Sequence, residues 1–129
     1  MNKKVLIVDD DKVILKMYVL KFQQGGFLVD TALGGKEALE KVESFQPDII
    51  LLDVVMYPLD GFDVLQQLNT LVGLQKKPRV VLLSNLGETS DLERGKELGA
   101  IDYIIKSQLT PQEVLERVEH IIGLSSGTL

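Results

Sequence analysis

The chain has 129 residues, a length that suits one compact domain able to bury most of its apolar side chains. It has no cysteine and one histidine, which excludes disulfides, thiolate metal sites and imidazole clusters, so any metal must be bound by oxygen atoms. The net charge of -5, with lysines and arginines scattered along the chain, argues against direct binding to a nucleic-acid backbone.

The first predicted strand is Val5–Val8, a short apolar run that ends in the acids Asp9–Asp11. This run is far too short for a signal peptide or a membrane span, so we expect a cytoplasmic protein that does not insert into membranes. A helix from Lys12 to about Gln24 should follow. Its apolar residues suit one face of an amphipathic helix, namely Val13, Ile14, Met17, Tyr18 and Leu20.

The middle of the chain contains an unbroken apolar run that ends in one acid. Phe27–Ala32 should form an edge strand, and a helix opened by Gly34–Gly35 should follow it. Ile49–Asp53 is then predicted to be a strand buried on both faces, as in a parallel sheet, with a carboxylate at its C-terminal end. Pro58 and Gly61 mark the turn after it.

A helix after Gly61 leads into the next predicted strand, Arg79–Ser84, which ends at a hydroxyl. The helix that follows should start at Ser90, with Glu93 as its capping-box partner. Its apolar face is thin and it contains Gly95, so we expect it to be the least firmly packed helix.

The last predicted strand, Ile101–Ile105, runs directly into Lys106. Thr110–Glu113 combines a capping box with proline at the first helical position and should begin the final helix. We expect residues 1–123 to form the domain and residues 124–129 to form a flexible tail.

Five strands that alternate with five helices predict an α/β fold, a doubly wound (βα)5 flavodoxin-like three-layer sandwich with a parallel sheet of order 2-1-3-4-5. A barrel would need roughly twice the length. In such sheets ligands bind beyond the C-terminal ends of the strands. The polar residues expected at those ends are Asp9, Asp10, Asp11, Asp53, Ser84 and Lys106.

The predicted strand order makes the first and third strands neighbours, so Asp9, Asp10 and Asp53 should converge. Two carboxylates this close repel by roughly 1 kcal/mol in water and by more in a less polar crevice, so the cluster needs a cation. With only oxygen ligands available, Mg2+ that keeps several waters fits better than an enclosed Ca2+ ion.

Lys106 and Ser84 should face this cluster, an arrangement suited to a phosphoryl group. The metal and Lys106 would neutralise the phosphoryl oxygens, while Ser84 would donate a hydrogen bond to one of them. A carboxylate would serve as the nucleophile and form an acyl phosphate, and Asp53 is the best placed to do so.

With these residues in place, the sequence resembles the receiver domain of two-component response regulators, as in stand-alone chemotaxis regulators, over essentially Lys3–Ile122. The matching positions are Asp9, Asp10, Asp53, Met56, Asp60, Gly61, Ser84, Tyr103 and Lys106. The resemblance implies a regulatory domain rather than an enzyme, whose only catalysis is its own phosphorylation and dephosphorylation.

The resemblance also implies that a sensor histidine kinase or a histidine phosphotransfer domain donates the phosphoryl group to Asp53. Mg2+ would be held by Asp10, Asp53 and the backbone carbonyl of Val55, with Asp9 acting through water. Ser84 would then move toward the phosphate while Tyr103 turns inward.

The surface that changes would consist of the helix from Ser90, the strand from Ile101 and the last helix. The partners implied are a downstream protein, whose identity the resemblance leaves open, and a homodimer that forms on phosphorylation. Both a stand-alone regulator and a receiver cut from a longer protein fit the sequence.

Three positions differ from the family pattern. Tyr57 takes the place of the usual proline, with Pro58 one residue later, so the loop beside the metal should follow a different path. Asn85 replaces a small residue and should narrow access to the phosphoryl group, which would slow small phosphodonors until Asn85→Ala relieves it. Ser107 follows Lys106 where the family has a cis-linked proline, so we expect either a trans bond with a re-routed loop or a strained cis bond.

Other interpretations of the same residues stay open. Asp11 alone is favoured as a helix cap, and Tyr103 could serve packing only. Asp9 and Asp11 also fit the opening motif of haloacid-dehalogenase-type phosphatases, although that function leaves Asp53 unexplained. A flavin-binding domain would set its phosphate against the aspartates, which would repel it. A degenerate receiver that acts as a phosphorylation-independent interaction module is consistent with the three departures.

Overall fold

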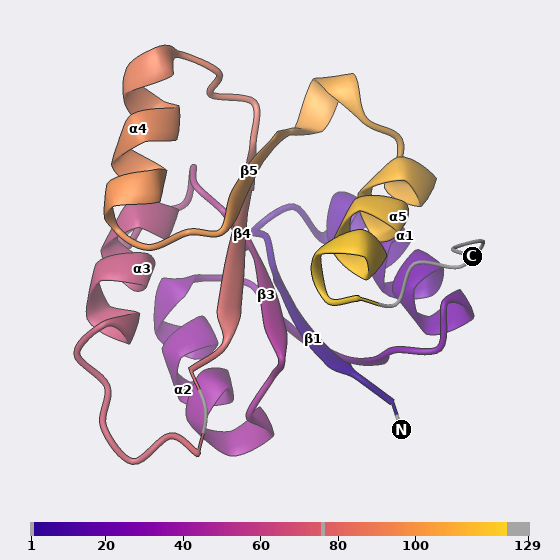
Figure 1. The fold of residues 1–129 in the computed structure, drawn as a ribbon, viewed down its shortest axis with the longest axis horizontal. Coiled ribbons are helices and arrows are strands. Elements are labelled where there is room, and N and C mark those ends of the chain that lie inside the picture. The colour runs from indigo at the N-terminus through magenta and orange to yellow at the C-terminus, as the bar shows by residue number, and fades with distance from the viewer. Residues whose placement is uncertain (1, 76, 124–129) are drawn as a thin grey trace.

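The computed structural model describes residues 2–75 and 77–123. Its strands form one parallel sheet of order β2-β1-β3-β4-β5, as predicted (Figure 1). In chain order the elements are β1 (Lys4–Val8), α1 (Lys12–Gln24), β2 (Leu28–Ala32), α2 (Gly35–Phe45), β3 (Ile49–Asp53), α3 (Gly61–Leu68), β4 (Arg79–Ser84), α4 (Thr89–Glu97), β5 (Asp102–Ile105), the 3-10 helix η1 (Lys106–Gln108) and α5 (Pro111–Ile121).

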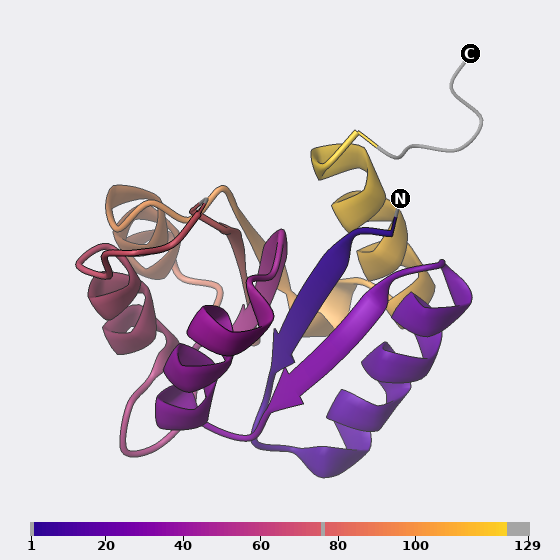
Figure 2. The same ribbon diagram turned by 90° about the horizontal axis from the view of Figure 1, so that it is seen from below.

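Helices cover both faces of the sheet, which makes the predicted three-layer sandwich. Helices α1 and α5 lie on one face, and α2, α3 and α4 lie on the other (Figures 1 and 2). The apolar side chains accordingly form two cores, one between the sheet and α1 and α5, the other between the sheet and α2 and α3. Because βαβ crossovers are right-handed, the helices change face where the chain reverses its direction across the sheet, which happens after β2.

Strand β3 lies at the centre of the sheet, and all of its residues are buried. Ile50 and Leu52 belong to the core beneath α2 and α3, while Ile49 and Leu51 belong to the core beneath α1 and α5. An unbroken apolar run is what burial on both faces requires, and the prediction for this strand is confirmed. Its last residue, Asp53, is thereby held at the C-terminal edge of the sheet.

The predicted buried face of α1 is partly wrong. The buried residues are Leu15, Tyr18 and Phe22, whereas Val13 and Met17 are 71% and 47% exposed. The helix carries apolar side chains around much of its circumference, so periodicity alone does not determine which stripe meets the sheet. The cap at its start is as predicted, because the Asp11 carboxylate accepts hydrogen bonds from the N–H groups of Val13 and Ile14.

The predicted start of α4 is also wrong. The helix begins at Thr89 after an extended Glu88, and no side chain caps it. Ser90 already lies inside the helix, so it lacks the non-helical backbone that an N-cap needs. The expectation of thin packing agrees with the structure, since Gly95 is the buried residue of α4. The predicted capping box of Thr110 and Glu113 is present at the start of α5.

The predicted tail, residues 124–129, lies outside the described residues, so the boundary at residue 123 stays a prediction. Within the described part of the chain, no helix combines the length and apolar character needed to cross a membrane.

Candidate functional site

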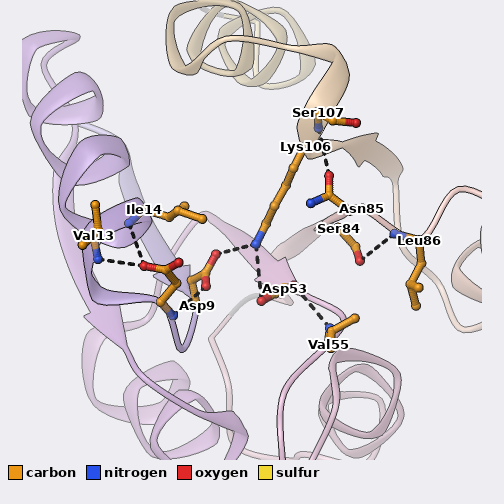
Figure 3. A network of polar contacts seen from close by, with 11 residues as sticks. Asp9, Val13, Ile14, Asp53, Val55, Ser84, Asn85, Leu86, Lys106 and Ser107 are labelled. Atoms are coloured by element: carbon orange, nitrogen blue, oxygen red, sulfur yellow. Dashed lines mark hydrogen bonds and ion pairs between the residues drawn. The ribbon is translucent and has the colours of Figure 1, made fainter.

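The C-terminal edge of the sheet gathers the polar residues singled out in the sequence (Figure 3). Strands β1 and β3 are parallel neighbours with Val8 opposite Leu52, so Asp9 and Asp53, which come next, stand side by side. Ser84 ends β4, and Lys106 follows β5 at the start of η1. Topology thus brings together residues that are far apart in the chain.

Three carboxylates form a cluster that could hold a cation. Asp9, Asp10 and Asp53 each offer an oxygen atom within 4.8 Å of those of the other two. Asp9 and Asp53 are buried, whereas Asp10 is exposed. Hard divalent cations prefer carboxylate oxygens, and an exposed third ligand leaves room for the waters that Mg2+ retains. The residues present therefore fit the predicted metal.

Lys106 reaches into the cluster from the opposite side. Its Nζ lies 2.7 Å from Oδ2 of Asp9 and 3.4 Å from Oδ2 of Asp53. Burial lowers the pKa of Lys106, but its hydrogen bond to Asp9 and the negative charges of Asp53 and Asp9 outweigh this, so the net pKa is raised. The ammonium group stays charged and partly balances the acids.

Asp53 differs electrostatically from an ordinary aspartate. Burial raises its pKa from 3.8 to about 6, and the charge of Asp9 adds to this, while Lys106 and the N–H of Val55 act in the opposite direction. That N–H donates to Oδ1 of Asp53 at 3.2 Å. In the absence of a further cation, the Asp53 carboxylate is thus costly to ionise in the folded protein.

This raised pKa predicts a pH-dependent stability. Because the folded state binds the Asp53 proton more tightly than the unfolded chain, its stabilising contribution is full below pH 3.8 and is lost as pH rises through about 6. With chelator present, Asp53→Asn should therefore be more stable than the wild type above about pH 7 by roughly 2 to 3 kcal/mol, and little different near pH 4. Urea unfolding at both pH values measures this. If Asp53→Asn is no more stable than the wild type near neutral pH, the ionised Asp53 carboxylate does not destabilise the folded protein.

Ser84 and Tyr103 meet at the same loop residue. The buried Ser84 accepts a hydrogen bond at its Oγ from the N–H of Leu86 at 3.2 Å, and the Tyr103 hydroxyl donates to the carbonyl of Leu86 at 2.6 Å. Burial is the main reason that the pKa of Tyr103 is raised. The two residues predicted to act as a switch are thus linked through the backbone of Leu86, which no sequence pattern indicated.

The structure gives the backbone and hydrogen bonds at the three departures from the family pattern, Tyr57, Asn85 and Ser107. The peptide bond between Tyr57 and Pro58 is the cis bond found within the described residues, so the Lys106–Ser107 bond is trans, and Lys106–Gln108 form η1. The Oδ1 of Asn85 accepts a hydrogen bond from the N–H of Ser107 at 2.9 Å, and the expectation that Asn85 narrows access to the phosphoryl group stays a prediction.

The loop after Asp53 is held by α3. Asp60 caps this helix, and Asp60 and Asp63 form a reciprocal capping box, which was not among the predictions from the sequence. The N–H of Gly61 donates to the carbonyl of Val54 at 2.8 Å, which fastens the start of α3 to the end of β3. The backbone that directly follows Asp53 is thus tied to the start of α3.

Comparison with protein families matches residues 5–119 to the response regulator receiver domain. The chain is 40% identical over 127 residues to the alkaline phosphatase synthesis transcriptional regulatory protein PhoP of Bacillus subtilis (strain 168), covering 97% of this chain and 50% of that protein. It is 35% identical over 121 residues to a probable transcriptional regulator, ycf27, of Guillardia theta, covering 94% of this chain and 46% of that protein. The chain spans about half the length of these relatives.

Solved structures give the same match. The receiver domain of the Francisella response regulator 1452 has a TM-score of 0.84 at 33% identity, with 95% of this chain and 98% of that chain covered. A chain of the CheX-CheY-BeF3-Mg2+ complex from Borrelia burgdorferi has a TM-score of 0.82 at 32% identity, with 93% of this chain and 89% of that chain covered. Sequence and structural comparisons agree on one family.

Proposed function

This chain belongs to the family of response regulator receiver domains, and from that premise we propose that it is a signalling switch that accepts a phosphoryl group on Asp53. The observation that carries the proposal is the position of Lys106, whose Nζ lies between the carboxylates of Asp9 and Asp53 at the C-terminal edge of the sheet. The donor would be a sensor histidine kinase or a histidine phosphotransfer domain of the two-component system.

We further propose that Mg2+ binds the acidic cluster. Asp10, Asp53 and the backbone carbonyl of Val55 would hold it, with Asp9 acting through water; the oxygens that Asp9, Asp10 and Asp53 offer within 4.8 Å of one another support this. The ion would supply positive charge for the phosphoryl oxygens. The cluster would also be relieved of its internal repulsion, so that Asp53 is ionised at neutral pH.

In the transfer step, an Asp53 carboxylate oxygen attacks the phosphorus atom and forms the P–O bond of an acyl phosphate. The bond from phosphorus to the donor nitrogen, or to the donor oxygen of a small phosphodonor, breaks and its electron pair leaves with the donor. Lys106 neutralises charge on the phosphoryl oxygens, and the hydroxyl of Ser84 donates a hydrogen bond to one of them. Hydrolysis of the acyl phosphate later returns the carboxylate.

The output surface would be formed by α4, β5 and α5. When Ser84 moves toward the phosphoryl group, its contact with Leu86 changes, and Tyr103 shares that residue. Helix α4 is thinly packed, which supports its assignment as the element that shifts. A downstream protein and a phosphorylation-dependent homodimer are the partners proposed for the switched state.

The relatives are named transcriptional regulators and are about twice as long as this chain. For this chain, the lack of direct nucleic-acid contact and a location in the cytoplasm stay predictions. We also propose that its only catalysis is its own phosphorylation and dephosphorylation. The phosphatase alternative needs a free Asp11, and the hydrogen bonds that Asp11 accepts at the start of α1 weigh against it.

Incubation with acetyl phosphate and Mg2+, read by intact mass, tests the proposal. The wild type should gain one phosphoryl group, Asp53→Asn should gain none, and chelation of the metal should abolish the adduct. Asp11→Asn is the matched control, since asparagine also caps helices well and the variant should be phosphorylated like the wild type. An unmodified wild type with every donor tried would support a degenerate receiver, and multiple turnover of a phosphate ester would support a phosphatase.

A further inference from the structure

Two departures from the family pattern contact each other directly. Oδ1 of Asn85 accepts a hydrogen bond from the backbone N–H of Ser107 at 2.9 Å. In Figure 3 the Asn85 side chain lies between Ser84 and Ser107 and turns its oxygen toward Ser107. The contact needs both residues, because a proline at position 107 would have no N–H and a small residue at position 85 would have no acceptor.

This hydrogen bond lies just beyond the last paired residues of β4 and β5. Strands β4 and β5 are paired up to Ser84 opposite Ile105, and their ladder ends there. Beyond it, Lys106 and Ser107 begin η1, whose first N–H groups have no partner within so short a helix. The Asn85 side chain supplies a partner for one of these groups and so continues the connection between β4 and β5.

The segment fixed in this way carries Lys106. Its Nζ must span from η1 to Asp9, just after β1, and to Asp53 at the end of β3, so the site depends on where the backbone of η1 lies. On the other side of the hydrogen bond, Asn85 directly follows Ser84, the proposed switch hydroxyl. One side chain therefore connects the backbone of the switch segment to the backbone that carries the active-site cation.

We propose that Asn85 is a positioning residue for Lys106, and that the Asn85–Ser107 hydrogen bond fixes the backbone from which Lys106 reaches the acids. The inference rests on the proposed function, because it concerns the placement of the cation that receives the phosphoryl group. The proposal also reverses the effect of Asn85→Ala on the phosphorylation rate that the sequence predicted. An Asn85 that merely obstructs the site would slow phosphorylation, so removing it would speed the reaction; a positioning Asn85 makes its removal slow the reaction.

Asn85→Ala tests this on three measurements. Hydrogen exchange at the Ser107 amide, followed by NMR, should become about two- to tenfold faster, the range expected for one hydrogen bond. The Lys106 Nζ resonance should shift, and phosphorylation by acetyl phosphate should slow by about two- to tenfold. Asn69→Ala is the matched control, because Asn69 is an exposed asparagine that donates to the carbonyl of Leu98 at 2.8 Å, at the C-terminal end of α4, and it should leave all three measurements unchanged.

Ser107→Pro, which lacks the donor, separates positioning from obstruction. In that background Asn85→Ala should change neither the rate nor the Lys106 resonance. An equal effect of Asn85→Ala in both backgrounds, an unchanged Ser107 amide, or faster phosphorylation of Asn85→Ala would overturn the proposal. If the wild type takes up no phosphoryl group, the proposed function fails, while the Ser107 amide and the Lys106 resonance still decide whether Asn85 positions the lysine.

Discussion

Replacing Lys106 with methionine should slow phosphorylation of Asp53 by about ten- to hundredfold, because it removes a preorganised cation from the place where phosphoryl charge develops. Removing one such charge-stabilising group usually slows a reaction by about 100- to 1000-fold. We expect a smaller loss here, because a divalent cation would share the charge of the phosphoryl oxygens. The rate of adduct formation with acetyl phosphate and Mg2+, followed by intact mass, measures this effect.

The same substitution should also destabilise the fold. The side chains of Asp9 and Asp53 are only 3% and 6% exposed, and Lys106 is the cation that lies against both. Breaking a buried ion pair by removing one partner costs about 3 kcal/mol or more near neutral pH, and the cost should fall at lower pH as Asp53 takes up a proton. Since Lys106 lowers the pKa of Asp53, that pKa should rise further in the variant.

Lys41→Met is the matched control for charge removal. Lys41 pairs with Asp30 at 2.7 Å, the same separation as the Lys106–Asp9 pair, but both side chains are about one-third exposed. A surface pair of this kind contributes about 1 kcal/mol or less, so both the stability and the phosphorylation rate should change little. If the Lys106→Met protein is phosphorylated as fast as the Lys41→Met protein, Lys106 does not take part in the phosphorylation of Asp53.

Gly61→Ala should lower the free energy of unfolding by about 3 kcal/mol or more and the melting temperature by roughly 10 °C. A Cβ atom at Gly61 would overlap the carbonyl oxygen of Asp53 and approach the Cα of Val54 to 2.8 Å. These are backbone atoms of the central strand and its loop, so no side chain can rotate away to make room. The displaced atoms belong to the phosphoacceptor itself, and phosphorylation should slow as well.

Gly34→Ala provides the comparison for Gly61→Ala, monitored by thermal and urea unfolding. Gly34 precedes α2 in extended backbone, and a Cβ atom there would meet nothing within 4 Å. Its replacement should cost about 1 kcal/mol or less, the usual difference between glycine and alanine at a helix N-cap. If the two substitutions destabilise the protein equally, the backbone of Asp53 and Val54 does not exclude a side chain at position 61.

The fold and the membership of the site could be predicted because they depend on coarse features of the sequence. Each strand is an apolar run that ends in a polar residue, and parallel topology places all those ends at one edge of the sheet. Asp9, Asp53, Ser84 and Lys106 could therefore be assigned to one site before any distance was known. The distances then supplied what the pattern lacked, namely that Lys106 contacts both buried acids.

The features that could not be predicted depend on how helices and backbone groups are oriented in space rather than on residue type. On α1, Val13 and Leu15 are equally apolar, and only the way the helix lies on the sheet decides that Leu15 is buried. The link of Ser84 and Tyr103 through Leu86 uses backbone atoms, which every residue possesses. The Asn85–Ser107 contact joins the segment after β4 to η1 across 22 residues of chain, and neither residue's type indicates the other as its partner.

The position of the phosphoryl group tests the assignment of Asp53 most directly. After reaction with acetyl phosphate and Mg2+, borohydride reduction converts an aspartyl phosphate into the corresponding alcohol, and peptide mass spectrometry then locates the changed residue. We predict reduction at Asp53 in the wild type and at no residue when the phosphodonor is omitted. Reduction at Asp9 or Asp10 in place of Asp53 would contradict the assignment of Asp53 as the phosphoacceptor.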